Sequence, residues 1–229
     1  ARTEPEWGIW NIPNSELALL PDDLSGQRAI ELGCGTGYVS AWMRRRGAAE
    51  YAIDNSEQQL ATARRLAVEH RLDDIEWVHG NAETVDQPDA TFDFAISEYG
   101  AAIWCDPYVW VPEAHRLLRR GGLLVFLGNH PLGMVCTPVS GDAPAGLTLQ
   151  RGYFGLGRLD WADALDDPGG IEFNMEISSW MRLFRMTGFD VVDYVEIQAP
   201  ASADGIRYWV DAAWAKRFPS EQAWILQKR

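Results

Sequence analysis

Short apolar runs alternate with amphipathic stretches along most of the chain. Apolar runs typical of buried strands lie at residues 28–33, 50–53, 75–78, 92–97, 123–127, 189–197 and 223–227. Stretches with apolar residues three and four positions apart, typical of helices with one buried face, lie at residues 37–46, 56–70, 107–119, 176–187 and 208–217. This alternation predicts an α/β fold, with a doubly wound, mostly parallel sheet of seven strands and helices on both faces.

Two segments break this pattern. Residues 1–27 combine Trp7 and Trp10 with several prolines, which predicts a short helical flap. Residues 131–173 are rich in glycine and proline, which is typical of a lid or a binding loop. We therefore expect a single domain made of a flap (1–27), a core (28–130), a lid or substrate insert (131–173) and the last part of the sheet (174–229).

The composition limits the classes of function. The chain has 229 residues, of which 47% are hydrophobic and 23% charged, and these values suit one globular domain. A formal net charge of -13 disfavours nucleic-acid binding, because phosphate backbones are repelled. No apolar run approaches the roughly 20 residues needed to span a bilayer, and the first residues lack the features of a signal peptide, so a cytoplasmic protein without membrane contact is expected.

The sequence ELGCGTG, residues 31–37, follows the first apolar run directly. Glycine lacks Cβ, so Gly33, Gly35 and Gly37 allow a sharp turn from strand to helix and a close approach of a ligand to the backbone. Such a turn is either a nucleotide cradle or a tight connection. The G-x-G-x-x-G spacing of dinucleotide folds fits poorly, because its last position falls on Tyr38 or Ser40. The spacing therefore leans away from NAD without excluding it.

Polar side chains follow the next predicted strands, each where a strand ends. They are Asp54, Asn81, Glu98 with Tyr99, and Asn129 with His130. Ligands of open α/β sheets bind beyond the carboxyl ends of the parallel strands, so these residues fall on one edge. Asp54 stands 21 residues after Gly33, the separation of a carboxylate that accepts hydrogen bonds from ribose hydroxyls. Capping and turn formation are the alternative use of Asp54 and Asn81.

These motifs carry a family resemblance. Residues 28–130 resemble the class I, Rossmann-like S-adenosylmethionine-dependent methyltransferases, especially the small-molecule (type 11) group that includes ubiquinone and menaquinone biosynthesis enzymes. ELGCGTG looks like their first motif, AIDNSEQQLATAR (52–64) like the second strand and helix, GNAETVDQPDATFDFAISE (80–98) like the third and fourth motifs, and PEAHRLLRRGGLLVF (112–126) like the helix and turn before the fifth strand. Asn81 departs from the pattern, since the family usually has Asp there.

The resemblance implies S-adenosyl-L-methionine as the cofactor. It implies that Glu31 orients either the glycine loop or the amino group of the cofactor, that Asp54 holds the ribose, and that Glu98 or Tyr99 lies near the reacting sulfonium. Asn81 and Ala82 would meet the adenine. The expected cofactor-binding residues are Glu31, Gly33, Cys34, Gly35, Gly37, Asp54, Asn55, Asn81, Ala82, Glu83, Glu98 and Tyr99.

The same resemblance implies methyl transfer to an O, N or C nucleophile of a small molecule by in-line displacement. If a base is used, His130 is the first candidate because it follows the fifth strand and histidine titrates near neutrality, with a structural histidine as the alternative. Tyr99 is the second catalytic candidate. Aromatic residues that could form a substrate pocket are Trp7, Trp10, Trp104, Tyr108, Tyr153, Phe154 and Trp161.

Two other classes of function stay open. The first is an NAD(P)-dependent oxidoreductase, and the second is an S-adenosylmethionine-binding protein without catalysis. No metal site is expected, because Cys34, Cys105 and Cys136 are widely separated and form no CxxC pair. The acceptor atom and the oligomeric state do not follow from the sequence.

Overall fold

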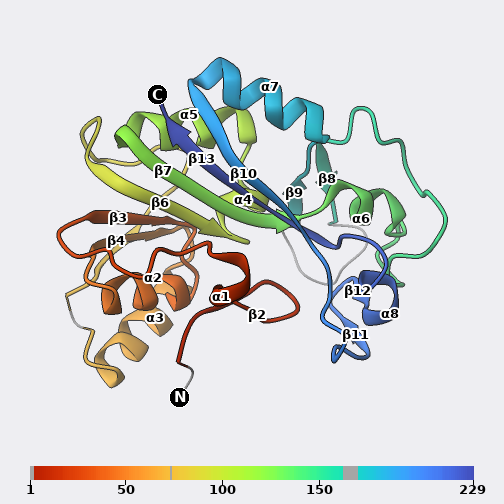
Figure 1. Cartoon of the computed structure of the whole chain (residues 1–229), viewed down its shortest axis with the longest axis horizontal. Coiled ribbons are helices and arrows are strands. Elements are labelled where there is room, and N and C mark those ends of the chain that lie inside the picture. The colour runs from red at the N-terminus through yellow and green to blue at the C-terminus, as the bar shows by residue number, and fades with distance from the viewer. Residues whose placement is uncertain (1–2, 73, 162–169) are drawn as a thin grey trace.

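A seven-stranded sheet forms the centre of the molecule (Figure 1). The computed structural model describes residues 3–72, 74–161 and 170–229. The strands of the sheet are β3 (Arg28–Leu32), β4 (Ala49–Asp54), β5 (Glu76–His79), β6 (Phe92–Glu98), β7 (Leu118–Asn129), β10 (Phe189–Ile197) and β13 (Glu221–Lys228). Their order is β10-β13-β7-β6-β3-β4-β5. The pairs from β7 to β5 are parallel, whereas β13 runs antiparallel to β7 and β10, so the predicted fold class is confirmed.

Helices cover both faces of the sheet (Figure 1). On one face lie α5 (Pro107–Leu117) and α7 (Ile177–Thr187), and on the other lie α2 (Tyr38–Arg45) and α3 (Glu57–Glu69). The ring of Trp110 on α5 packs 5.3 Å from that of Phe126 on β7, and the ring of Phe184 on α7 packs 5.1 Å from that of Trp224 on β13. Strand β7 is apolar on both sides because both of its faces are covered.

Side-chain caps begin two of these helices. Ser56 Oγ accepts a hydrogen bond from Gln59 N at 3.3 Å at the start of α3. Asp106 Oδ1 accepts from Tyr108 N at 2.9 Å at the start of α5, directly before Pro107. Both side chains satisfy a backbone N–H that has no partner within the helix. Asp106 is thus occupied as a cap.

The N-terminal segment is a hairpin followed by one helical turn, so the prediction of a helical flap is wrong. Strand β1 (Glu6–Trp7) pairs antiparallel with β2 (Ile12–Pro13), and α1 (Asn14–Leu17) follows. Gly8 and Asn11 have positive φ values of 66° and 54°, which turn the chain between the two strands. Trp10 Nε1 donates to Ser220 Oγ at 2.9 Å and fastens this flap to the body.

The insert holds three short elements in its described part. They are α6 (Pro131–Cys136), β8 (Arg158–Asp160) and β9 (Ile171–Phe173), and the two strands pair antiparallel. Residues 162–169 of the predicted lid lie outside the described residues.

A second hairpin, β11 (Ile206–Arg207) and β12 (Val210–Asp211), precedes α8 (Ala212–Ala215). The helix predicted at 208–217 is therefore limited to four residues. Tyr208 has a φ of 53°, which is incompatible with an α-helix and places it in the turn of the hairpin. No helix of the described chain is long and apolar enough to cross a membrane.

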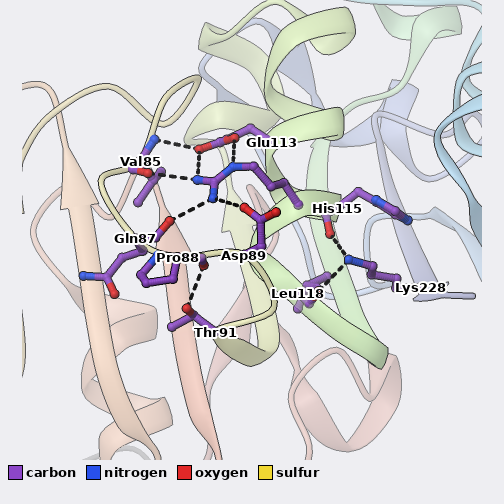
Figure 2. A network of polar contacts seen from close by, with 10 residues as sticks. Val85, Gln87, Pro88, Asp89, Thr91, Glu113, His115, Leu118 and Lys228 are labelled. Atoms are coloured by element: carbon purple, nitrogen blue, oxygen red, sulfur yellow. Dashed lines mark hydrogen bonds and ion pairs between the residues drawn. The ribbon is translucent and has the colours of Figure 1, made fainter.

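Arg116 joins the end of α5 to the loop before β6, on the side of the sheet where β6 and β7 begin. Figure 2 shows the groups that it contacts, among them Glu113, Val85 and Gln87. Its guanidinium donates to both carboxylate oxygens of Glu113 at 2.7 Å and to the carbonyl oxygens of Val85 and Gln87 at 3.0 Å and 2.8 Å. Lys228 Nζ donates to the carbonyl oxygens at the end of α5. These hydrogen bonds and ion pairs connect the segments at the amino ends of β6 and β7. The carboxyl ends of the parallel strands lie on the opposite side of the sheet, where a site is expected.

Phe184→Ala should destabilise the protein, because this ring is fully buried against Trp180 and Trp224. We expect the free energy of unfolding, measured by urea denaturation, to fall by about 3–5 kcal/mol. Phe154→Ala removes the same side chain at a position that is 85% exposed, and it should stay within about 0.5 kcal/mol of the wild type. Equal losses in the two variants would contradict the packing of α7 on the sheet.

Candidate active site

Two glycines bring the loops after β3 and β6 into direct contact. Gly33 has a φ of +79°, and a Cβ added there would lie 2.6 Å from Gly100 Cα. A Cβ on Gly100 would in turn overlap the carbonyl oxygen of Gly33. Gly35 also has a positive φ, of +52°, but a Cβ there would meet open space. Gly33 and Gly100 thus serve backbone packing, and Gly35 leaves the loop open to a ligand.

Gly37 and Glu31 fix the helix that follows the glycine loop. Gly37 precedes α2, and a Cβ there would overlap the indole ring of Trp77. The carboxylate of Glu31 accepts from Ser40 N at 2.7 Å and from the Ser40 hydroxyl. Burial raises the pKa of Glu31 to about 8, although the hydrogen bonds from Ser40 oppose this shift. Glu31 therefore joins β3 to α2.

Asp54 ends β4 and contacts the glycine loop. Its Oδ2 accepts from Gly35 N at 2.7 Å, and its Oδ1 accepts from Ser56 N at 2.8 Å. The second contact is the turn-forming use that the sequence offered as an alternative. Because each carboxylate oxygen has a further lone pair, the side chain can still accept hydrogen bonds from ligand hydroxyls.

A cleft of about 930 Å³ opens at the carboxyl ends of β3, β4 and β6. This volume is in the range of small-molecule sites. The residues expected to bind cofactor that line it are Glu31, Gly33, Cys34, Gly35, Asp54, Asn55, Asn81, Ala82, Glu83, Glu98 and Tyr99. Gly37 is absent from the lining, because it packs against Trp77. Further walls come from α4 (Ala101–Trp104) and from the insert, through Arg158, Ile171 and Phe173.

Asn81 and Glu83 form a local turn in one wall of the cleft. Asn81 Oδ1 accepts from Glu83 N at 2.9 Å. Glu83 Oε1 accepts from Asp106 N at 2.7 Å, which joins this wall to the start of α5. The amide group of Asn81 is thus used within the protein while the residue still lines the cleft.

The cleft is acidic. Its described lining carries the carboxyl groups of Asp54, Glu83 and Glu98 and a single basic side chain, Arg158. The Glu31 carboxyl group also lines the cleft, but its pKa of about 8 keeps it largely protonated at neutral pH. This arrangement favours a ligand with positive charge and repels the pyrophosphate of a dinucleotide. The glycine spacing only leaned away from NAD. The charge of the cleft favours S-adenosylmethionine, which carries a positive sulfur, over a dinucleotide such as NAD.

A second cavity, of about 410 Å³, adjoins the cleft. Glu98, Tyr99 and Trp104 line both spaces. The other residues that line the second cavity come from the flap, α4, the end of β7, β9 and the turn of the β11–β12 hairpin, and they are Gly8, Ile9, Ile103, Asn129, Glu172, Tyr208 and Trp209. The cleft and the second cavity thus meet at Glu98, Tyr99 and Trp104.

Two carboxyl groups, those of the buried Glu221 and the partly exposed Glu98, hold the flap over this junction. Glu98 Oε1 accepts from Gly8 N at 2.7 Å, and Glu221 Oε1 accepts from Ile9 N and from the Tyr99 hydroxyl at 2.9 Å each. Burial raises the pKa of both carboxyl groups to about 7. Sequence reasoning missed Glu221, because it lies in the last strand and far from the motifs. The one available signal was an acid at the start of an apolar run.

His130 does not line the cleft or the second cavity. Its Nδ1 accepts from Leu132 N at 3.1 Å and caps α6, and its Nε2 lies 3.1 Å from Glu196 Oε1. Burial lowers the pKa of the imidazole. The expectation that His130 is the base is corrected accordingly, because its two ring nitrogens are engaged in a helix cap and in a hydrogen bond with Glu196.

Tyr99 lies at the junction but is poorly suited to accept a proton. Its hydroxyl donates to Glu221 Oε1, and burial raises the pKa of the phenol well above its ordinary value. The phenol therefore stays protonated and positions the Glu221 carboxyl group.

Among the aromatic residues expected in a substrate pocket, Trp104 lines both spaces. The other six lie outside these two linings. Trp7, Trp10 and Trp161 are buried in the body of the protein, Tyr108 and Phe154 are exposed on its surface, and the Tyr153 hydroxyl accepts from Ile177 N at 3.3 Å. Tyr208 and Trp209 take their place, and the sequence reasoning missed both because it expected a helix there.

Known proteins share this fold and these motifs. Residues 30–126 match the family model described as a methyltransferase domain. The chain is 33% identical over 129 residues to 2-methyl-6-phytyl-1,4-hydroquinone methyltransferase 2 of Oryza sativa subsp. japonica, which covers 54% of this chain and 36% of that protein. It is 38% identical over 101 residues to a malonyl-[acyl-carrier protein] O-methyltransferase of Enterobacter lignolyticus (strain SCF1), which covers 43% of this chain and 38% of that protein. The match thus spans little more than a third of the length of these curated relatives.

A solved structure extends the likeness beyond the motifs. The crystal structure of an S-adenosylmethionine-dependent methyltransferase from Mesorhizobium loti matches with a TM-score of 0.74 and 24% identity, over 93% of this chain and 96% of that chain. The fold is therefore the class I, Rossmann-like fold of this solved structure. Residues 30–126 are a methyltransferase domain of this type, and the resemblance seen in the sequence is confirmed.

S-adenosyl-L-methionine is the cofactor that this domain implies. The residues present fit it in three respects. Gly35 leaves the loop open to a ligand, Asp54 keeps lone pairs for ribose hydroxyls, and the carboxyl groups of the lining, with Glu98 at the junction, suit a cation. No cluster of three or more His, Cys, Asp or Glu side chains that could hold a metal ion occurs in the described residues.

Asp54→Ala should weaken binding of S-adenosylhomocysteine by about tenfold or more, because it removes a charged acceptor from both the loop and the ligand. Equilibrium dialysis with labelled S-adenosylhomocysteine measures this affinity. Asp74→Ala is the control, since it removes an exposed carboxylate that pairs with Arg44. Unchanged affinity in the folded Asp54→Ala protein would exclude Asp54 from the cofactor site.

Glu221→Gln should reduce the pH dependence of stability. The pKa of Glu221 is raised to about 7 from an ordinary value of 4.5, so its favourable contribution is fully present below pH 4.5 and is lost as the pH rises through about 7. Relative to the variant, the wild type should therefore lose stability as the pH rises from about 4.5 to about 7 in urea denaturation. The exposed substitution Glu69→Gln should show no such difference. An identical pH profile for wild type and Glu221→Gln would refute the assignment.

Proposed function

We propose that the protein transfers the methyl group of S-adenosylmethionine to an oxygen, nitrogen or carbon nucleophile of a small molecule. The observation that carries this proposal is the junction of the acidic cleft with the second cavity at Glu98, Tyr99 and Trp104. A cofactor in the cleft and an acceptor in the second cavity would meet there. Two adjoining spaces of this kind are what transfer between two bound molecules requires.

When bound, the cofactor would supply a methyl group on a positive sulfur; the acceptor lone pair would bond to the methyl carbon, and the electron pair of the C–S bond would go to sulfur. The leaving group is already good, so positioning can supply much of the rate. Gly33 and Gly35 would let the loop lie close to the methionine part, and Asp54 would accept from the ribose. Asn81 and Ala82 would border the adenine.

Glu98 has two tasks in this proposal. Its carboxyl group lies at the junction, where negative charge favours a positive sulfur in the cleft. Because burial raises its pKa to about 7, the same group can accept a proton from an acceptor near neutral pH. Glu98 therefore replaces His130 as the candidate base.

The segments outside the methyltransferase motifs would form the acceptor site. The flap (1–27) contributes Gly8 and Ile9, and the insert (131–173) contributes β9. Residues 28–130 would hold the cofactor, and 174–229 would complete the sheet and add the β11–β12 hairpin. Backbone bonds from Gly8 and Ile9 to the carboxyl groups of Glu98 and Glu221 would keep water away from the junction.

The names of the relatives support a small acceptor. One is named for a phytyl hydroquinone, and the other for a malonyl group on a carrier protein. The net charge of -13 supports a partner other than nucleic acid. A cytoplasmic location stays a prediction.

The two alternatives make different demands on the site. An oxidoreductase would have to hold a pyrophosphate beside the carboxyl groups of Asp54, Glu83 and Glu98. The described lining offers a single arginine, Arg158, to offset them. A binding protein without catalysis would hold the same cofactor and needs no open second cavity. The acidic lining and the junction favour methyl transfer over both.

With S-adenosylmethionine labelled in the methyl group and a small-molecule extract as acceptor, label should move into the small-molecule fraction. Glu98→Gln should lower the transfer rate about 100-fold, because it cannot accept a proton, while S-adenosylhomocysteine affinity changes much less. Glu69→Gln, an exposed change on α3, controls for the lost charge. Tight cofactor binding without transfer to any fraction would support the non-catalytic alternative.

A further inference from the structure

The second cavity presents hydrogen-bond acceptors to a ligand. Apart from its aromatic residues, its polar side chains are Glu98, Asn129 and Glu172. The backbone N–H groups of Gly8 and Ile9 are already used by the carboxyl groups of Glu98 and Glu221. A ligand that brings donors therefore suits these side chains.

Strand β9 delivers Glu172 to this cavity. Side chains alternate across a strand, so Ile171 and Phe173 line the cleft while Glu172 between them lines the second cavity. One short strand thus forms a wall of both spaces. It gives an apolar face to the cleft and a carboxyl group to the second cavity.

Asn129 adds a buried acceptor with no partner. The residue is 4% exposed, and no described group bonds to its Oδ1. Its Nδ2 donates to Glu172 Oε2 at 3.5 Å, so the reverse amide orientation would place two oxygen acceptors together. A buried acceptor without a partner is unfavourable unless a ligand donor fills it. Asn129 Oδ1 therefore marks the place of a donor.

The walls of the second cavity are aromatic. Trp104, Tyr208 and Trp209 line it, and no Lys, Arg or His does so among the described residues. The faces of indole and phenol rings attract cations as well as apolar groups. Gly133 lets Trp209 approach, since a Cβ there would lie 2.5 Å from its ring.

The charge of Glu172 depends on its burial and on the polar groups around it. Burial raises the pKa of Glu172, whereas hydrogen bonds from the Trp161 and Asn174 side chains and the charge of Arg151 oppose this shift. The Arg151 guanidinium lies 5.2 Å from the centre of the Trp161 ring and donates to the Thr137 carbonyl oxygen at 3.0 Å. The Arg151 side chain therefore does not line the second cavity, and the cavity keeps its acidic character.

We propose that the second cavity binds the methyl acceptor as a protonated arylalkylamine. The ammonium group donates to Asn129 Oδ1 and to the carboxyl group of Glu172, and the aromatic part packs against Trp104 and Trp209. This inference rests on the proposed function, because it names the acceptor class of the same site. The proposal also disfavours acceptors that carry a carboxylate, because Glu98 and Glu172 would repel them.

An ammonium nitrogen has no lone pair, so it must lose a proton before it can attack carbon. The N–H bond breaks, its electron pair stays on nitrogen, and the proton passes to the Glu98 carboxylate. The lone pair would then form the new N–C bond as the C–S bond of the methyl donor breaks and its electron pair goes to sulfur. Glu98 lines both the cleft and the second cavity and so lies where this proton is released.

Binding of three matched probes tests the acceptor class on the wild-type protein. The probes are 2-phenylethylamine, 2-phenylethanol and phenylacetate, each titrated in the presence of saturating S-adenosylhomocysteine and followed by tryptophan fluorescence. The amine should bind about tenfold or more tightly than the alcohol, and phenylacetate should bind least. Equal or tighter binding of the alcohol or the carboxylate, or no binding of the amine, would overturn the proposal.

Glu172→Gln tests the charge of the Glu172 carboxylate, because it removes the charge and keeps the size of the side chain. It should reduce amine affinity about tenfold and leave alcohol binding and S-adenosylhomocysteine binding unchanged. Glu69→Gln removes a charge on α3 and should leave all three unchanged. Failure of S-adenosylhomocysteine to bind the wild type would reject the proposed function itself, whereas cofactor binding without amine preference would reject only the acceptor class. Since the probe series needs no variant, a misfolded Glu172→Gln protein would not remove the test.

Discussion

The close contact between the backbones of Gly33 and Gly100 is the constraint on which the site depends. Any Cβ at either position would overlap the other loop, so the turns after β3 and β6 can meet only as glycines. This contact sets the spacing of the two loops that form the floor of the cleft. Asp54 then ties Gly35 to the end of β4, and Glu31 ties the following helix to β3. Four elements are thus fixed around a space that they leave open.

Two carboxyl groups at the junction hold the flap in place. Glu221 is removed from water, whereas Glu98 is partly exposed and lines both spaces. Each accepts a hydrogen bond from a backbone N–H of the flap, and Glu221 also accepts one from the Tyr99 hydroxyl. Gly8 is required for this approach, because a Cβ would overlap the Glu221 carboxylate. The flap is therefore held by the acidic groups that give the junction its charge. Closure of the site and its electrostatics depend on the same bonds.

Much of the fold and most of the cleft could be predicted from the sequence, because local patterns determine them. One short stretch holds the strand at 28–33, the glycine turn and Asp54. The apolar run predicts the strand, the glycines predict the turn, and the end of the next strand predicts the position of Asp54. The second cavity could not be predicted in this way. Its residues come from the flap, β7, β9 and a late hairpin, which only the folded chain brings together. His130 shows the limit of arguing from strand ends, since the residue stands at the expected edge while its ring turns to a helix cap.

The central claim is that the acidic cleft binds a cationic sulfonium cofactor and not a dinucleotide. Calorimetric titration of the wild-type protein with S-adenosylmethionine, and separately with NADH, tests it most directly. The account predicts one binding site per chain for S-adenosylmethionine and no detectable heat of binding for NADH. Clear binding of NADH, with none for S-adenosylmethionine, would contradict it.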